Sequence, residues 1–97
     1  MPSIYTVTLN PALDKTVHVP NFTVDQVNRI NWLRRDAGGK GINVSKVIAK
    51  LGGESTAIAV LAGQTGQWIA NTLDENNIKV HAITVPGETR TNLKVVD

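Results

Sequence analysis

Cysteine is absent from the sequence, which excludes a disulfide-stabilised scaffold and a cysteine-ligated zinc site. The absence also fits a reducing compartment, and we expect a cytoplasmic protein. No apolar run approaches the roughly 18 residues that a membrane-spanning helix requires. The N-terminal segment lacks the basic stretch and the long apolar stretch of a signal peptide. We therefore expect no association with a membrane.

Positive charge is neither abundant nor clustered. Ten Lys and Arg residues oppose eight Asp and Glu residues, which gives a formal net charge of +2. The densest basic cluster is Arg34–Arg35, and Asp36 follows it directly. Since a nucleic-acid-binding protein normally gathers its positive charge on one surface, we expect no nucleic-acid partner. The apolar share of 41% is ordinary for a globular chain, and 97 residues allow one small domain at most.

Strand and helix patterns alternate along much of the sequence. Strands rich in β-branched residues are predicted at residues 4–9, 56–61 and 79–85. Helices are predicted at residues 42–51 and 67–75, each after a glycine-rich stretch. In the first helix the apolar spacing would bury Val44, Val47, Ile48 and Leu51. The strand–helix–strand–helix–strand order indicates parallel strands joined by right-handed crossovers.

A second group of strands has one polar face. These strands are predicted at residues 16–19, 27–35 and 90–96. The alternation leaves Ile30 and Trp32 on an apolar face that nothing else in the sequence covers, which is typical of a contact surface. The sequence stops at Asp97, directly after an apolar strand. Since about three parallel strands make an incomplete sheet, we expect the N-terminal part of a longer protein.

The glycine-rich stretch at residues 37–41 is the first candidate for a binding site. Lys40 is followed by Gly41 and Ile42, so the stretch is neither a P-loop nor the complete dinucleotide fingerprint. Glycines let the backbone approach a ligand, and the start of the next helix offers free N–H groups for hydroxyls or an anion. The glycines could equally serve only to turn the chain. Asn43, in the first turn of that helix, could bind a ligand or cap the helix.

Asp14 and Arg90 are the other candidates. Asp14 lies just beyond the carboxyl end of the first strand, where ligands bind in open α/β sheets. Its carboxylate suits sugar hydroxyls, although a solvated loop aspartate is the alternative. The planar guanidinium of Arg90 suits phosphate, although a surface ion pair with Glu88 is the alternative.

Several segments together resemble a known family. They read YTVTLNPALD at 5–14, VNR at 27–29, AGGKGINVS at 37–45, LG at 51–52 and GETRTN at 87–92. These residues and their spacing are similar to the N-terminal part of the ribokinase-like carbohydrate kinases, also called the PfkB family. The branch that they resemble most is the group of 1-phosphofructokinases and tagatose-6-phosphate kinases.

The resemblance implies a fold. It is the N-terminal portion of a ribokinase-like three-layer α/β/α fold with a small β-sheet lid, so the chain would be a fragment of one kinase domain. The α/β core would comprise residues 1–13 and 37–85, and the lid strands about residues 14–36 and 88–97. Because the lid often forms the dimer contact in this family, the resemblance also implies a homodimer through the lid sheet.

The resemblance further implies roles for individual residues. Sugar hydroxyls would be held by Asp14, by Gly38 and Gly39 in the glycine turn, and by Asn43. Lys40 would lie near the sugar or its phosphate. The phosphate already on the sugar would be bound by Arg90, with Asn92 nearby and Arg29 as a further contact. No catalytic residue and no metal ligand is expected within the chain.

The implied reaction is ATP-dependent phosphorylation of a ketose phosphate, which requires ATP and Mg²⁺. The run at residues 90–94 favours fructose 1-phosphate, converted to fructose 1,6-bisphosphate, over tagatose 6-phosphate as the substrate. The family's catalytic aspartate and ATP pocket lie far towards the C-terminus and are absent from this sequence, so the chain alone is expected to be inactive. The alternative is a non-catalytic dimerisation module in which the glycine turn is purely structural.

Overall fold

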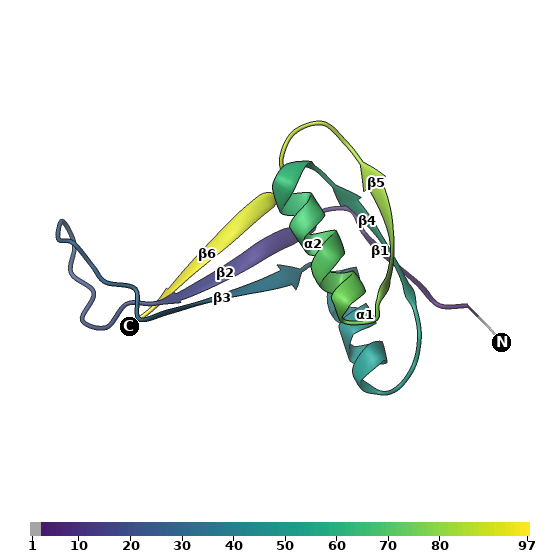
Figure 1. Cartoon of the computed structure of the whole chain (residues 1–97), viewed down its shortest axis with the longest axis horizontal. Helices are drawn as coiled ribbons and strands as arrows, with labels where there is room; N and C mark the ends of the chain where they lie inside the picture. The colour runs from purple at the N-terminus through teal and green to yellow at the C-terminus, as the bar shows by residue number, and fades with distance from the viewer. Residues whose placement is uncertain (1–2) are drawn as a thin grey trace.

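The computed structural model describes residues 3–97. In chain order its elements are β1 (Tyr5–Thr8), β2 (Ala12–His18), β3 (Trp32–Gly38), α1 (Lys40–Lys50), β4 (Thr56–Leu61), α2 (Gly63–Glu75), β5 (Lys79–Thr84) and β6 (Arg90–Val96). They form a core sheet in the order β1-β4-β5 and a lid sheet in the order β3-β2-β6, which extends to one side of the core (Figure 1). Within residues 3–97, no helix is long and apolar enough to cross a membrane. The predicted core range starts at residue 1, and its first two residues lie outside the described ones.

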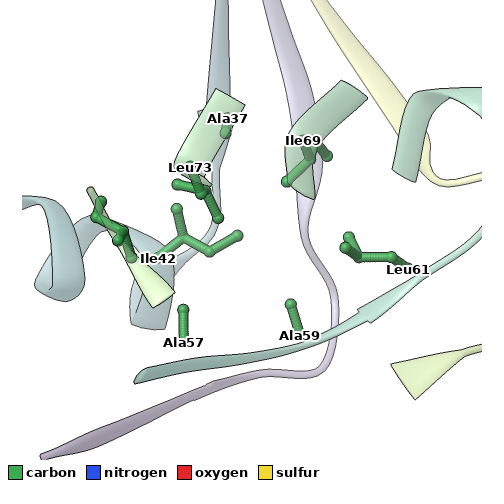
Figure 2. Packing of buried hydrophobic residues seen from close by; sticks show 8 residues of the cluster. Ala37, Ile42, Ala57, Ala59, Leu61, Ile69 and Leu73 are labelled. Atoms are coloured by element: carbon green, nitrogen blue, oxygen red, sulfur yellow. The ribbon is translucent and has the colours of Figure 1, made fainter. Parts of the chain in front are cut away.

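The core sheet is parallel, as the alternation of strands and helices predicts. Both helices pack on one face of it, where Ala57 and Ala59 of β4 are almost fully buried. These small side chains let the helices approach closely, and Ile42, Ile69 and Leu73 fill the space between helices and sheet (Figure 2). Fully burying one such aliphatic side chain contributes about 1.5–3 kcal/mol, so these three are a main source of core stability.

The opposite face of the core sheet is exposed. Tyr5 and Val7 of β1 and Ile83 of β5 point away from the helices, and 63%, 58% and 46% of their respective surfaces are accessible. The described residues therefore provide the sheet and one helical layer of the predicted three-layer fold.

Side chains of β1 hold the start and the middle of α1. The helix has no capping side chain of its own, because a glycine precedes it. Instead, Thr8 Oγ1 accepts a hydrogen bond from the buried Ile42 N–H at 3.0 Å. One turn further, the hydroxyl groups of Thr6 and Ser45 are hydrogen-bonded at 2.7 Å. Ser45 is fully buried, so this bond satisfies polar atoms that would otherwise destabilise the core.

The lid sheet has β2 at its centre. β2 pairs with β3 in antiparallel orientation and with β6 in parallel orientation along its whole length. The strand predicted at 16–19 is therefore the end of a longer strand that begins at Ala12, and the strand predicted at 27–35 lies instead at Trp32–Gly38. Each neighbour satisfies backbone N–H and C=O groups of β2, and such pairing is not visible in a local sequence pattern. The strand predicted at 90–96 is confirmed as β6.

Both helices begin earlier than predicted. α1 starts at Lys40 and α2 at Gly63, so the glycine-rich stretches form the starts of helices rather than separate turns. Between β3 and α1 stands a single residue, Gly39. The sequence pattern underestimates both helices because glycine is a poor helix former, whereas tertiary contacts hold these helix starts on the sheet.

The buried face of α1 also differs from the predicted one. Ile42 and Ser45 face the sheet and are fully buried. The apolar spacing places Val44, Val47 and Leu51 there, yet each is more than half exposed, and Ile48 is only half-buried. The hydroxyl contacts with β1 orient the helix, so its most apolar stripe lies on the outer surface.

We predict that Gly41→Ala destabilises the chain. A side-chain carbon on Gly41 would lie 2.5 Å from Thr8 Oγ1 and 2.7 Å from the Val7 carbonyl oxygen, closer than van der Waals contact allows. Such overpacking costs about 1–3 kcal/mol, which outweighs the gain of about 1 kcal/mol from replacing glycine within a helix. Urea unfolding followed by tryptophan fluorescence measures the free energy of unfolding.

The matched control is Lys50→Ala, at an exposed position of the same helix. Its free energy of unfolding should change by less than about 0.5 kcal/mol. A Gly41→Ala chain that is as stable as the unmodified chain would contradict the close contact between α1 and β1.

Candidate functional site

The lid and the core meet at the carboxyl edge of the core sheet. Here β1, β4 and β5 end, and the segments that lead into the lid begin (Figure 1). A cleft of about 220 Å³ opens at this edge, and its lining includes Asn10, Pro11, Ala62, Thr89 and Arg90. This is the position at which open α/β sheets bind ligands.

Asp14 lies in the middle of the lid sheet, on β2. Its register partners are Asp36 on β3 and Asn92 on β6, so the three side chains share one face. The Asn92 amide donates a hydrogen bond to Asp14 Oδ1 at 3.1 Å. Asp14 is half-buried, and its position within a strand excludes a solvated loop. The lid thus presents a carboxylate that a neighbouring amide orients.

Two glycines adjoin this carboxylate. Gly38 lies diagonally across the sheet from Asp14, and a side-chain carbon on it would collide with Asp14 Oδ2. Gly39 follows with φ +134, a conformation that favours glycine, and it packs against Thr8. The first glycine therefore makes room for Asp14, and the second turns the chain into α1.

Lys40 and Asn43 lie on the first turn of α1. Lys40 is exposed, directly after the glycine turn. The cap proposed for Asn43 is wrong, since no side chain caps α1 from its own sequence and the Asn43 N–H donates to the Gly39 carbonyl at 2.8 Å. The Asn43 side chain lines a different hollow, of about 650 Å³, between α1 and α2. The structure therefore places the glycine turn beside Asp14 but forms no hydrogen bond between Asn43 and Asp14.

Arg90 is the first residue of β6 and shares the lid face of Asp14 and Asn92. Its Nη2 donates to the Asn10 carbonyl oxygen at 3.2 Å, and the residue is exposed. It forms no ion pair with Glu88, whose carboxylate binds the start of α2 instead. The positive charge of Arg90 is therefore available to an anionic ligand at the cleft.

Arg29 lies apart from this group. It belongs to the connection between β2 and β3, residues 19–31, at the end of the lid that is remote from the core (Figure 1). Within one chain, the structure does not bring it together with Asp14 or Arg90.

Two residues that sequence reasoning misses, Glu88 and Thr89, fasten the segment before Arg90. Glu88 Oε1 accepts the Thr65 N–H at 2.6 Å, and this backbone hydrogen bond is the main reason that the pKa of Glu88 is lowered. Thr89 Oγ1 accepts the Ala62 N–H at 2.8 Å. The sequence pattern gives no signal for these contacts, because the start of α2 after Ala62, without a Ser, Thr, Asp or Asn cap, becomes visible only in the structure.

The described residues do not fit a site for Mg²⁺. Among residues 3–97, no three His, Cys, Asp or Glu side chains are grouped so that they could hold a metal ion. The neighbouring carboxylates of Asp14 and Asp36 are each engaged by another side chain, Asn92 and Arg34 respectively. Each of these carboxylates therefore already accepts a hydrogen bond from a neighbouring side chain.

Comparison with known proteins gives matches along nearly the whole chain. The pfkB family of carbohydrate kinases matches residues 7–97. The chain is 44% identical over 92 residues to the 1-phosphofructokinase of Bacillus subtilis (strain 168) and 42% identical over 94 residues to that of Rhodobacter capsulatus. These alignments cover 95% and 97% of this chain and 30% of each relative, so the chain spans less than a third of the curated relatives' length.

Solved structures match the fold as well. Phosphofructokinase-2 of Escherichia coli, solved in complex with fructose-6-phosphate, superposes with a TM-score of 0.88 at 38% identity over 98% of this chain and 31% of that chain. The tetrameric inhibited form of the same protein superposes with a TM-score of 0.89. Both matches include the core sheet, its helices and the lid. The chain therefore belongs to the pfkB family of carbohydrate kinases and has the ribokinase-like α/β fold of their N-terminal part.

Proposed function

We propose that the chain is the substrate-binding N-terminal part of an ATP-dependent ketose-phosphate kinase that converts fructose 1-phosphate to fructose 1,6-bisphosphate. The observation that carries this proposal is the position of Asp14, Asn92 and Arg90 on one face of the lid, where the lid meets the core. The names of the two curated relatives support the choice of substrate. Because the chain spans 30% of each relative, the proposal concerns a longer polypeptide.

In this proposal the described residues bind and orient the sugar phosphate. Asp14 accepts hydrogen bonds from ketose hydroxyl groups, and Asn92 keeps its carboxylate in one orientation. Arg90 offers two parallel N–H donors to the phosphate, which is the geometry that a guanidinium provides. Gly39 lets the sugar approach the backbone, and Lys40 adds positive charge at the start of α1. Orientation of this kind lowers the barrier by removing rotational and translational freedom before the reaction.

ATP and Mg²⁺ would be bound by parts of the kinase outside this chain. Phosphoryl transfer needs a metal ion, charge stabilisation on the γ-phosphate and an oriented nucleophile. The described residues supply only groups suited to the last of these tasks. The chain alone would therefore bind a sugar phosphate without phosphorylating it.

Two other functions fit less of what is observed. Tagatose 6-phosphate would use the same kinds of contact, but the run at residues 90–94 and the names of the curated relatives favour fructose 1-phosphate. A module that serves only dimerisation has no need for an oriented carboxylate beside an exposed guanidinium. The Asp14–Asn92 hydrogen bond therefore favours substrate binding.

Arg90→Ala in the full-length kinase is expected to raise the KM for fructose 1-phosphate by more than about tenfold. The reason is that a hydrogen bond between charged groups contributes about 1.5–3 kcal/mol. A coupled assay of ADP release measures KM and kcat. The matched control is Lys79→Ala, which removes an exposed positive charge at the start of β5, away from both faces of the lid, and should leave the KM unchanged.

The same assay on the unmodified kinase tests which sugar phosphate the kinase prefers. We expect a higher kcat/KM for fructose 1-phosphate than for tagatose 6-phosphate or fructose 6-phosphate. A preference for fructose 6-phosphate would contradict the proposed substrate, and an unchanged KM in Arg90→Ala would contradict the phosphate contact.

We further propose that two copies of the kinase pair through the lid. The lid face opposite Asp14 exposes Leu33, Leu93 and Val95, with accessible fractions of 42%, 64% and 46%. Ile30 and Trp32, predicted as a contact surface, are exposed as well, but Trp32 is in register with His18 and therefore lies on the lid face of Asp14. Grouped apolar side chains on a surface are typical of an interface.

Leu93→Asp is expected to weaken this dimer by at least about tenfold in Kd, because burying an unpaired carboxylate at an apolar interface is strongly unfavourable. Sedimentation equilibrium measures the Kd. Lys94→Asp, on the neighbouring residue of the other lid face, is the control and should dimerise normally. A kinase that is monomeric at all concentrations would exclude the lid dimer.

A further inference from the structure

The start of α2 has no cap from its own sequence. The residue before the helix is Ala62, and the first helical residue is Gly63, with φ +65. The first N–H groups of a helix need acceptors, and the positive end of its dipole favours a negative charge. In this chain both requirements are met by a segment that lies more than twenty residues further along the sequence.

Glu88 provides the charge. Its Oε1 accepts the Thr65 N–H at 2.6 Å, and the carboxylate lies so close to Gly63 that a side-chain carbon there would be 2.5 Å from Glu88 Cδ. Hydrogen bonds from Thr65 and, more weakly, from Gln64 lower the pKa of Glu88, so the carboxylate is ionised at neutral pH. The glycine at position 63 is thus explained by the carboxylate that covers it.

Thr89 adds a second, buried attachment. Its Oγ1 accepts the Ala62 N–H at 2.8 Å, and its own N–H donates to the Ala62 carbonyl at 3.0 Å. Only 8% of its surface is accessible, and a side-chain carbon on Gly66 would lie 3.1 Å from its hydroxyl oxygen. We call Glu88 and Thr89 together the α2 anchor.

The next residue after the anchor is Arg90, where β6 begins. Among the described residues, β6 is an edge strand of the lid that pairs with β2 alone, and the chain enters it through the segment between β5 and β6. Before the anchor stands Gly87, with φ +105 and nothing near the position of a side chain. Arg90 is thus held on one side by its pairing with Ala12 and its hydrogen bond to the Asn10 carbonyl, and on the other side by the α2 anchor that directly precedes it.

We propose that Glu88 is a positioning residue for substrate phosphate: by binding the start of α2, it holds the Arg90 guanidinium at the cleft between lid and core. This inference rests on the proposed function, because it takes Arg90 as the phosphate contact. Glu88 also lines the cleft, but its carboxylate is engaged by the start of α2, so the inference assigns it a positioning role rather than a contact with the phosphate.

The test is a double-mutant cycle in the full-length kinase. Glu88→Ala should raise the KM for fructose 1-phosphate by about tenfold or more while kcat changes little, because a small displacement of a binding group weakens binding strongly. Glu88→Gln should restore most of the loss, since its amide oxygen still accepts the Thr65 N–H. In the Arg90→Ala background, Glu88→Ala should have no further effect on KM.

Unphosphorylated fructose separates positioning from a general structural role. Its inhibition constant should be the same in Glu88→Ala and in the unmodified kinase, because fructose has no phosphate for Arg90. Glu75→Ala, which removes an exposed acid from the other end of α2, is the matched control and should change neither constant. Equal weakening of fructose and fructose 1-phosphate, or a further KM increase in the Arg90→Ala background, would overturn the inference.

A second readout keeps the inference separate from the proposed function. In the full-length kinase, the Thr65 amide resonance should titrate together with the Glu88 carboxylate, at a pKa below the usual 4.5 for glutamate. Because folding lowers this pKa, the contribution of the Glu88 carboxylate to folding stability is complete above about pH 4.5. It is lost as the pH falls through the pKa that Glu88 has in the folded protein. A Thr65 resonance that does not respond would overturn the inference. A kinase without activity on fructose 1-phosphate would instead refute the proposed function.

Discussion

The end of β1 lies directly against the start of α1, and the site is arranged around this contact. Thr8 accepts the Ile42 N–H at 3.0 Å and packs on Gly39, while the backbone of Val7 leaves no room for a side chain on Gly41. Because the chain passes straight from β3 into α1 through one residue, this contact also fixes the end of the lid strand β3. The position of Asp14 relative to the helix start follows from it.

Both helices receive their caps from side chains outside their own sequence. Thr8, at the end of β1, serves α1, and Glu88, just before β6, serves α2. Each capping residue precedes a segment that enters the lid. A shift of the lid would therefore disturb a helix start, and the two helix starts hold the lid at a defined position against the core. The Thr8–Ile42 and Glu88–Thr65 hydrogen bonds therefore connect the core sheet and its helices to the segments that carry the site residues.

Local sequence patterns predict the parts of the fold that depend on local chemistry. The strand at 56–61 and the strand at 90–96 agree with β4 and β6, because their apolar or alternating residues and their flanking turns are unambiguous. The full length of β2 depends on pairing with two strands that lie far away in the sequence. Local pattern therefore misses it, and with it the placement of Asp14 within a strand.

Sequence patterns likewise predict only part of the candidate site. Asp14, Arg90 and the glycine turn are visible as residue types that suit a sugar phosphate, at places where a sheet binds ligands. The orientation of Asp14 by Asn92 depends on strand register, which a one-residue shift would reverse. The role of Glu88 depends on its hydrogen bond to a helix start more than twenty residues away in the sequence. A local sequence pattern does not reveal such a contact.

We propose that the lid and the core of this chain together form a site for a phosphorylated ketose. Calorimetric titration of fructose 1-phosphate into the 97-residue chain, with unphosphorylated fructose as the control, tests it most directly. We expect saturable binding of fructose 1-phosphate and much weaker binding of fructose. No binding of the phosphate, or equal binding of both sugars, would contradict it.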